Sequence, residues 1–162
     1  MPDTIESVAR RAREASFSLA GVSLEARNRA LEAIAREIES RVDDLLAVNA
    51  ADVEAATAEG LSAPLLSRLK LTHAKCAGMA EGLRSLAALP DPLGTVQYAK
   101  ELSPGLDLYR VSCPIGVVGV IFESRPDALV QIASLCLKSG NAVLLKGGRE
   151  AARTNEALTG LI

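Results

Sequence analysis

Two apolar runs with a helical pattern between them restrict the fold of this chain more than any other feature. The run "IGVVGVIF", residues 115–122, is rich in β-branched residues, which is typical of a strand buried on both faces. A second run, Val143 to Lys146, follows after a short crossover, so the unit predicts a parallel pair of strands and an α/β layer. Gly116 and Gly119 lie inside the first run rather than at its end, unlike a dinucleotide fingerprint, so we expect them to allow close packing of the sheet.

The segment between the two runs has the pattern of a mostly apolar helix. We expect it to begin at Pro126, which suits the first turn of a helix, and to end at Gly140. Its one polar stripe consists of Gln131, Ser134 and Lys138, which lie three and four residues apart.

The first part of the chain has the periodicity of helices. Asp3 opens a capping-box pattern, and Ser23 and Thr72 are expected to cap two later helices. The helix after Ser23 carries one apolar stripe that continues to Glu59, and Gly60 is expected to end it. The residues of this stripe are Leu24, Leu31, Ile34, Ile38, Val42, Leu45 and Leu46.

The pattern changes at "LPDPLG", residues 89–94. The segments "TVQYAKEL" and "LDLYRVS" flank Ser103-Pro104-Gly105, and two alternating segments around a Pro-Gly turn predict a β-hairpin. We therefore divide the chain into a helical part at 1–92, a hairpin at 93–113 and an α/β part at 114–162.

Composition restricts both the core and the kind of partner. Hydrophobic residues make up 49% and charged residues 23%, which is typical of a globular chain, and the two Tyr and two Phe leave the core to aliphatic side chains. A net charge of −2 provides no basic surface for nucleic acid, and no apolar run is long enough for a membrane helix. Three widely spaced cysteines without a visible secretory signal predict reduced thiols in the cytoplasm.

Polar residues follow each predicted strand, at the edge of the sheet where ligands bind in open α/β folds. After the second strand come Lys146, Gly147, Gly148, Arg149 and Glu150. The glycines allow a sharp bend and close approach of a ligand, and the helix N-terminus that follows is expected to present free N–H groups to an anion. The pattern fits a phosphate- or ribose-bearing ligand, and it fits a tight turn with surface cations equally well.

The end of the first strand carries Glu123, Ser124 and Arg125. A carboxylate, a hydroxyl and a guanidinium can hold a polar substrate, and they can also pair with neighbouring groups and cap the following helix. His73 is expected to face solvent, and no Cys/His spacing indicates zinc.

The cysteines give no clear nucleophile. Cys76 and Cys136 fall among apolar helix positions and are expected in the core, whereas Cys113 is expected to be reachable but has no histidine nearby in sequence to activate it.

The motifs "ESRPDALVQIAS" and "LLKGGREAARTN" resemble those of the γ-glutamyl phosphate reductases, also called glutamate-5-semialdehyde dehydrogenases, of the aldehyde dehydrogenase superfamily. The chain is closer still to the reductase half of the Δ1-pyrroline-5-carboxylate synthases. The resemblance extends upstream through "LLAVNAADVEAATAEGLSAPLLSRLKLT" and "LPDPLG", and it covers the chain from about residue 5.

The resemblance implies N-terminal helices, a hairpin of the oligomerisation part, and the first strand-helix-strand unit of a Rossmann-like NADPH-binding domain. It implies NADPH-dependent reduction of L-glutamyl 5-phosphate to L-glutamate 5-semialdehyde in proline biosynthesis, through attack of a cysteine thiolate on the acyl phosphate. A homo-oligomer and an association with glutamate 5-kinase are also expected. No cysteine of this chain matches the family's nucleophile, so we expect no catalytic residue here and no reductase activity from these 162 residues alone.

Two positions receive particular roles from the resemblance. Lys146 matches the strand-end lysine that contacts the adenosine ribose, and with NADPH a 2′-phosphate would lie near Lys146 and Arg149. Arg125 lies close to the place of the asparagine that assists the oxyanion in the wider superfamily. It would assist a developing negative charge or hold an anionic substrate, and the sequence does not choose between the two.

Two parallel strands are too few for a stable sheet. We therefore expect the chain to be the N-terminal piece of a longer protein, the alternative being a natural short form that borrows a sheet from a partner. Two other functions stay open: another oxidoreductase of the superfamily, and a non-catalytic nucleotide-binding module that works by assembly. The "ESRPDALVQ" turn argues against the first, because a general aldehyde dehydrogenase would carry an asparagine there.

Overall fold

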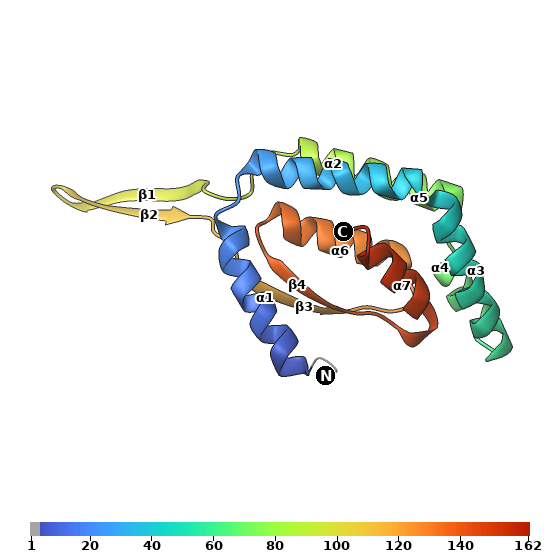
Figure 1. Cartoon of the computed structure of the whole chain (residues 1–162). Coiled ribbons are helices and arrows are strands. Elements are labelled where there is room, and N and C mark those ends of the chain that lie inside the picture. Colours follow the sequence, from blue (N-terminus) through green and yellow to red (C-terminus); the bar gives the residue numbers. More distant parts are fainter. Residues whose placement is uncertain (1–3) are drawn as a thin grey trace.

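The computed structural model describes residues 4–162 and contains helices, one β-hairpin and one pair of parallel strands (Figure 1). Asp3 of the expected capping box lies outside the described residues. The elements in chain order are α1 (Ile5–Ala20), α2 (Leu24–Ser40), α3 (Val42–Ala58), α4 (Ala63–Leu69), α5 (His73–Ala88), β1 (Val96–Ser103), β2 (Leu106–Val111), β3 (Val117–Ile121), α6 (Pro126–Lys138), β4 (Ala142–Lys146), the 3₁₀ turn η1 (Arg149–Ala151) and α7 (Ala152–Thr159).

The helices and the parallel strands form layers, which confirms the predicted α/β class (Figure 1). α2 and α5 lie side by side as an outer layer, α6 and α7 lie beneath them, and β3 and β4 lie beneath α6. α1 packs against β4 and β3, while α3 and α4 lie at one end and the hairpin of β1 and β2 projects from the other. Within residues 4–162, no helix has the length and apolar character needed to cross a membrane.

Local capping places the helix ends where the sequence predicts them. Ser23 Oγ accepts a hydrogen bond from the backbone N–H of Ala26 (3.3 Å), and Thr72 Oγ1 accepts one from that of Lys75 (3.1 Å). Gly60 follows α3 with a φ of 78°, a left-handed conformation that glycine adopts without strain.

The predicted single helix from Ser23 to Glu59 is wrong, because the structure divides it at Arg41. Arg41 has φ −118° and ψ 24°, outside the helical region, and α3 bends sharply away from α2 (Figure 1). The bend turns α3 toward α7 and η1 instead of carrying it past the end of α5. Since the apolar stripe continues through the bend, periodicity alone does not reveal it.

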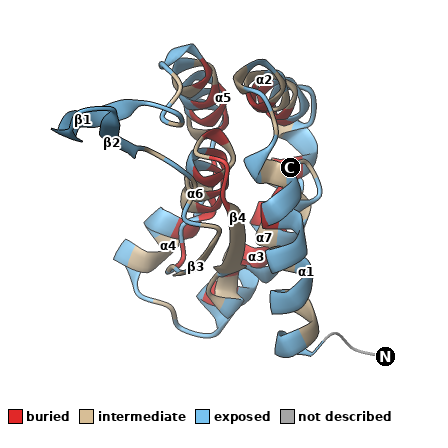
Figure 2. Ribbon diagram, turned by 90° about the vertical axis from the view of Figure 1, so that its left-hand side faces the viewer, coloured by how far each residue is buried: buried red, intermediate tan, exposed pale blue. Residues whose placement is uncertain are grey.

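The main core lies between the outer helical layer and α6–α7 (Figure 2). As predicted, it is built from aliphatic and sulfur-containing side chains, and burial of each leucine or isoleucine contributes about 1.5–3 kcal/mol. Its buried members include Leu31, Ile34 and Ile38 of α2, Cys76, Met79 and Leu83 of α5, Leu129 and Val130 of α6, and Leu158 of α7.

β3 and β4 pair in parallel, from Val117 opposite Ala142 to Ile121 opposite Lys146, as the strand-helix-strand pattern predicts. The expected burial on both faces is wrong, because β3 has no fully buried residue and Ile121 is 86% exposed. A sheet of two strands has no inner strand, so neither β3 nor β4 is enclosed by neighbours on both sides.

The expected close packing at the two glycines of this run is also wrong. A Cβ at Gly119 would meet no atom within 4 Å, and the same holds for Gly116. Gly116 instead has a φ of 117°, a conformation that residues with side chains rarely adopt.

Two members of the polar stripe predicted for α6, Ser134 and Lys138, are buried. Lys138 Nζ donates to Asn28 Oδ1 (2.9 Å) and to the backbone carbonyl oxygens of Ala87 (3.0 Å) and Leu89 (2.7 Å). Burial lowers the pKa of Lys138, although its three acceptors satisfy the ammonium group. The contacts attach the end of α6 to α2 and to the end of α5.

Arg27 extends this buried cluster toward the hairpin. Its guanidinium donates to the carbonyl oxygen of Lys138 and, over 2.8 Å, to Asp91 Oδ2. Asp91 Oδ1 in turn accepts the backbone N–H of Leu93 (3.0 Å). The cluster therefore fixes the segment from which the hairpin leaves the body.

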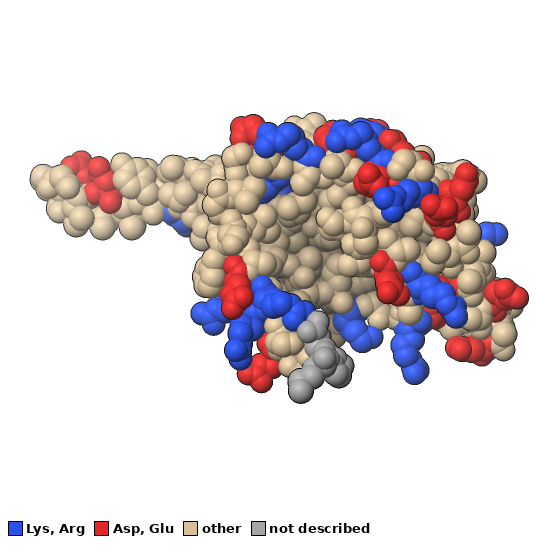
Figure 3. All heavy atoms as spheres, in the orientation of Figure 1, with Lys and Arg blue, Asp and Glu red and all other residues tan. Residues whose placement is uncertain are grey.

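The predicted hairpin is present, with β1 and β2 antiparallel and Gly105 at a φ of 77° in the turn. Every residue of both strands is exposed, and the arm projects from the body with charged and uncharged side chains at its surface (Figure 3). Its exposed large apolar side chains are Val96, Tyr98, Leu102, Leu106, Leu108, Tyr109 and Val111.

Candidate functional site

The two polar strand ends meet at one edge of the sheet. Ile121 lies opposite Lys146 in the parallel register, and the backbone N–H of Phe122 donates to the carbonyl oxygen of Lys146 (3.1 Å). This juxtaposition, predicted from parallel pairing, brings "FESRP" and "KGGRE" side by side.

Close contacts explain the glycines at the second strand end. A Cβ at Gly147 would clash with Asn155 Nδ2 and lie 3.1 Å from Phe122 Cζ, and a Cβ at Gly148 would clash with the carboxylate of Glu150. Neither glycine has a positive φ, so the expected sharp bend is not the reason for them. They leave room for neighbouring side chains of this chain.

Ser124 and Glu150 connect the two strand ends directly. Ser124 is 4% exposed, and its Oγ donates a hydrogen bond to Glu150 Oε1. Glu150 is half-buried and folds its carboxylate back over Gly148. Neither the resemblance nor residue spacing predicts this bond, because it joins residues 26 positions apart.

Two cations lie at the surface beside this bond. Lys146 is exposed and its Nζ donates to the carbonyl oxygen of Gly147 (2.8 Å). Arg149 is exposed as well, and within residues 4–162 its guanidinium forms no hydrogen bond or ion pair. The end of β4 therefore presents two positive charges to solvent, while the carboxylate of Glu150 turns toward the buried Ser124.

The helix N-terminus after these residues is not free, contrary to expectation. The 3₁₀ turn η1 precedes α7, and the backbone N–H of Thr154 in the first turn of α7 donates to Asp52 Oδ2 (2.8 Å). Asp52 is 3% exposed and also accepts the Thr154 hydroxyl (2.7 Å). A carboxylate of α3 already occupies the position where an anion would bind.

Asn49 completes this connection between α3 and the strand end. Its Nδ2 donates to Thr154 Oγ1 (3.2 Å), and its Oδ1 accepts the backbone N–H of Leu71 (2.7 Å). Sequence reasoning missed both polar residues, although Asn49 and Asp52 follow Leu45 at steps of four and three on the inward side of α3. Polar residues at such positions are the signal of buried hydrogen bonds.

Glu123, Ser124 and Arg125 do not form one site. Arg125 Nη2 donates to Asp127 Oδ2 (2.7 Å), which raises the pKa of Arg125. Glu123 is exposed and lies 3.6 Å from Arg68 Nη1 on α4. Arg125 and Glu123 thus pair with neighbours, and Arg125 provides no side-chain cap to α6.

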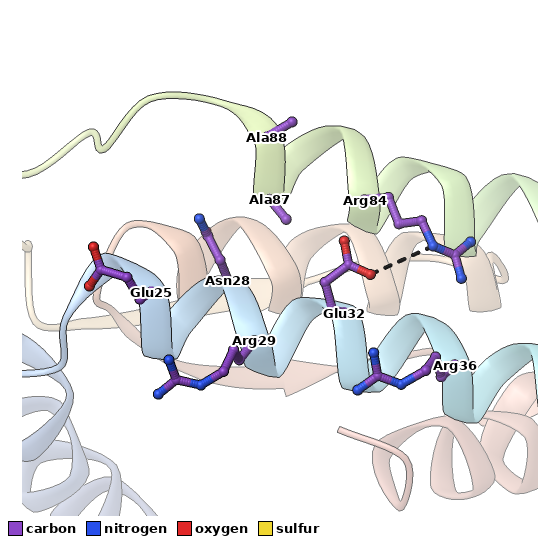
Figure 4. A pocket seen from close by; sticks show the side chains of 8 residues that line it. All are labelled: Glu25, Asn28, Arg29, Glu32, Arg36, Arg84, Ala87 and Ala88. Atoms are coloured by element: carbon purple, nitrogen blue, oxygen red, sulfur yellow. Dashed lines mark ion pairs between the residues drawn. The ribbon is translucent and has the colours of Figure 1, made fainter.

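A hollow of about 680 Å³ lies beside the second strand end, between α3 and the start of α7. Arg149 and Glu150 line it together with Asp52 and Arg153. A separate groove of about 570 Å³ runs between α2 and α5, on the far side of α6 from the sheet (Figures 1 and 4). The charged groups of that groove include the pair Glu32 and Arg84 (3.7 Å), and none of them reaches the strand ends.

The cysteines and the histidine behave as predicted. Cys76 and Cys136 are buried, which raises the pKa of each thiol, and Cys113 is exposed. His73 is exposed, with Nε2 3.4 Å from Asp43 Oδ1. Over residues 4–162, no group of three or more His, Cys, Asp or Glu is arranged to hold a metal ion.

Comparison with known proteins gives consistent results. No family model matches the chain. It is 52% identical over 161 residues, 99% of its length, to a γ-glutamyl phosphate reductase of Cyanothece sp., and 52% identical over 159 residues to one of Acetivibrio thermocellus. The chain spans about 37% of the length of each of these relatives.

Two solved structures have the same fold. The crystal structures of γ-glutamyl phosphate reductase from Saccharomyces cerevisiae and from Thermotoga maritima match 98% of this chain with a TM-score of 0.94 in both cases. Their sequence identities are 37% and 34%, and the matched region covers 40% and 38% of those chains.

Proposed function

We infer that the chain belongs to the γ-glutamyl phosphate reductases, to which it is homologous over nearly its whole length, and we propose that it takes part in the reaction of that family. That reaction is the NADPH-dependent reduction of L-glutamyl 5-phosphate to L-glutamate 5-semialdehyde in proline biosynthesis. The joint agreement of sequence and fold along the chain carries this proposal. Since the chain spans about 37% of its relatives, the reaction also needs the rest of such a protein, including its nucleophilic cysteine.

The groups at the second strand end fit the adenosine side of NADPH. Lys146 and Arg149 provide exposed cations for a ribose phosphate, and Gly147 and Gly148 leave room for the side chains of Asn155 and Glu150 beside them. Asn155, which packs against Gly147, has a buried Oδ1 without a partner among the described residues. NADPH would supply the hydride, and these residues would bind and orient the nucleotide.

The first strand end is the proposed substrate side. Arg125, the residue before α6, is exposed and its guanidinium is oriented by Asp127, which suits contact with an anionic substrate or with an oxyanion. The structure gives Glu123 and Ser124 less support as substrate residues, because Glu123 lies beside Arg68 and the Ser124 hydroxyl bonds to Glu150 on the cofactor side.

The division into a helical part at 1–92, a hairpin at 93–113 and a cofactor-binding part from 114 onward is likewise our proposal. The exposed apolar side chains of the hairpin support a role in contact between subunits of a homo-oligomer. We further propose a cytoplasmic location and an association with glutamate 5-kinase, the enzyme whose product would be the substrate.

Complementation tests the proposed function. The complete reading frame that contains this segment is expected to restore growth of a strain that lacks γ-glutamyl phosphate reductase without added proline, whereas a gene for these 162 residues alone is not. Failure of the complete frame, with the protein folded and soluble, would contradict the assignment. Growth supported by the segment alone would contradict the need for a cysteine outside it.

Lys146→Ala tests the cofactor site in the complete protein. Loss of a charge-assisted hydrogen bond, worth about 1.5–3 kcal/mol, is expected to weaken NADPH binding about tenfold or more. Lys100→Ala, on the exposed hairpin, is the matched control and is expected to leave the dissociation constant unchanged. Equal NADPH affinity in both variants would remove Lys146 from the site.

A further inference from the structure

The orientation of Glu150 is the feature of the site that the proposed function does not explain. Its carboxylate belongs to the same short segment as Lys146 and Arg149, yet it bonds to Ser124 on the other strand end. Within the described residues, no ion pair joins Glu150 to either cation. The hydroxyl of a buried serine, rather than a neighbouring cation, fixes the carboxylate.

At the end of a strand in a nucleotide-binding sheet, a carboxylate and a cation favour different cofactors, NADH and NADPH. At the end of a strand in a nucleotide-binding sheet, a carboxylate accepts hydrogen bonds from the ribose hydroxyls of NADH, whereas a cation accommodates the 2′-phosphate of NADPH. A free carboxylate beside the phosphate would repel it. This strand end contains both kinds of group, so its preference depends on where Glu150 points.

Three features of the chain hold Glu150 in place. Gly148 has no side chain where the carboxylate lies, and substitution there would clash with it. Ser124 is buried and lies two residues before Pro126, the first residue of α6. The start of this helix therefore fixes the backbone of Ser124. The backbone N–H of Arg125 donates to the carbonyl oxygen of Glu123 (2.6 Å), so the segment around Ser124 is a closed turn.

We propose that Ser124 is a positioning residue that sets the preference for NADPH over NADH, by holding the carboxylate of Glu150 away from the ribose. This inference rests on the proposed function, since it requires the cofactor to lie at Lys146 and Arg149. While Ser124 holds Glu150 by its hydrogen bond, Lys146 and Arg149 make the surroundings of the ribose positively charged, which favours the 2′-phosphate of NADPH.

The test is Ser124→Ala in the complete protein, with dissociation constants for NADPH and NADH measured by nicotinamide fluorescence. The released carboxylate is expected to repel the 2′-phosphate, to weaken NADPH binding about fivefold to tenfold and to leave NADH binding equal or tighter. The double variant Ser124→Ala/Glu150→Gln is expected to regain most of the preference for NADPH, because the released group no longer carries charge. Ser134→Ala is the matched control, since Ser134 is also buried and, among residues 4–162, its Oγ bonds only within α6 (2.9 Å to the carbonyl oxygen of Gln131).

The outcomes separate this inference from the proposed function. If the unmodified protein binds neither nucleotide, the cofactor assignment fails. If it binds both and Ser124→Ala keeps the original ratio of dissociation constants, the assignment stands and the role of Ser124 is overturned. Should Ser124→Ala not fold, Ser124→Cys replaces the strong donor with a weak one of similar size, and an unchanged ratio in that variant overturns the inference in the same way.

Discussion

Asp91 shows how a single carboxylate couples the helical layers to the hairpin. Burial disfavours its charged form, but the Leu93 N–H and the Arg27 guanidinium together outweigh burial and hold the pKa of Asp91 below its ordinary value of 3.8. Because the folded pKa is the lower one, the carboxylate stabilises the fold fully above pH 3.8. Below that pH the unfolded chain takes up the proton first, so the contribution is lost as the pH falls through the folded pKa.

The lowered pKa of Asp91 in the folded state gives a pH-dependent prediction for the stability of Asp91→Asn. Its free energy of unfolding in urea is expected to be lower than that of the wild type at pH 7, and the difference is expected to shrink as the pH falls below about 4. Asp107→Asn on the exposed hairpin is the control and is expected to change stability little at either pH. A difference for Asp91→Asn that stays constant from pH 7 to pH 2 would contradict the role of the carboxylate.

Single residues were predictable where their partners are local in sequence. Ser23 and Thr72 cap helices through N–H groups three residues ahead, and such bonds follow from residue type alone. Lys138 was predicted to lie on a polar stripe but is buried, because its acceptors are carbonyl oxygens at the end of a helix about 50 residues earlier in the chain. Burial of that kind depends on how helices pack, which periodicity does not specify.

At the scale of elements, Asp52 on α3 caps α7 across 102 positions of sequence. Asp52→Ala leaves the N–H and the hydroxyl of Thr154 without their buried acceptor, which is expected to lower the free energy of unfolding by about 1–3 kcal/mol. Asp43→Ala, on the exposed first turn of the same helix, is expected to change it by less than about 0.5 kcal/mol. Equal urea midpoints for the two variants would show that Asp52 does not hold α7.

The elements themselves were mostly predictable, and their relative placement was not. The hairpin and the strand-helix-strand unit follow from periods of two and 3.6 residues with Pro and Gly at their ends. The rule that parallel strands end at one edge also predicted that Lys146 and Ser124 would lie near one another. The bend at Arg41 and the hydrogen bond from Ser124 to Glu150 were not predicted. Each depends on contacts between residues far apart in sequence, and these leave no local sequence pattern.

At the scale of the whole molecule, the hairpin contributes little to the core and exposes seven large apolar side chains. Two strands alone are marginally stable in water, so such an arm is expected to be covered in an assembly. Replacement of residues 96–111 by a short Gly-Ser linker in the complete protein is expected to lower the oligomeric state measured by light scattering, with the helical body still folded by circular dichroism. An unchanged oligomeric state would contradict a role of the hairpin between subunits.

The central claim is that the cofactor's adenosine ribose lies at the end of β4, between Lys146 and Arg149. A crystal structure of the complete protein with NADP⁺ tests it most directly. We expect a 2′-phosphate oxygen within about 3.2 Å of a nitrogen of Lys146 or Arg149, with the Glu150 carboxylate still bonded to Ser124. A ribose phosphate bound elsewhere, with both cations in solvent, would contradict it.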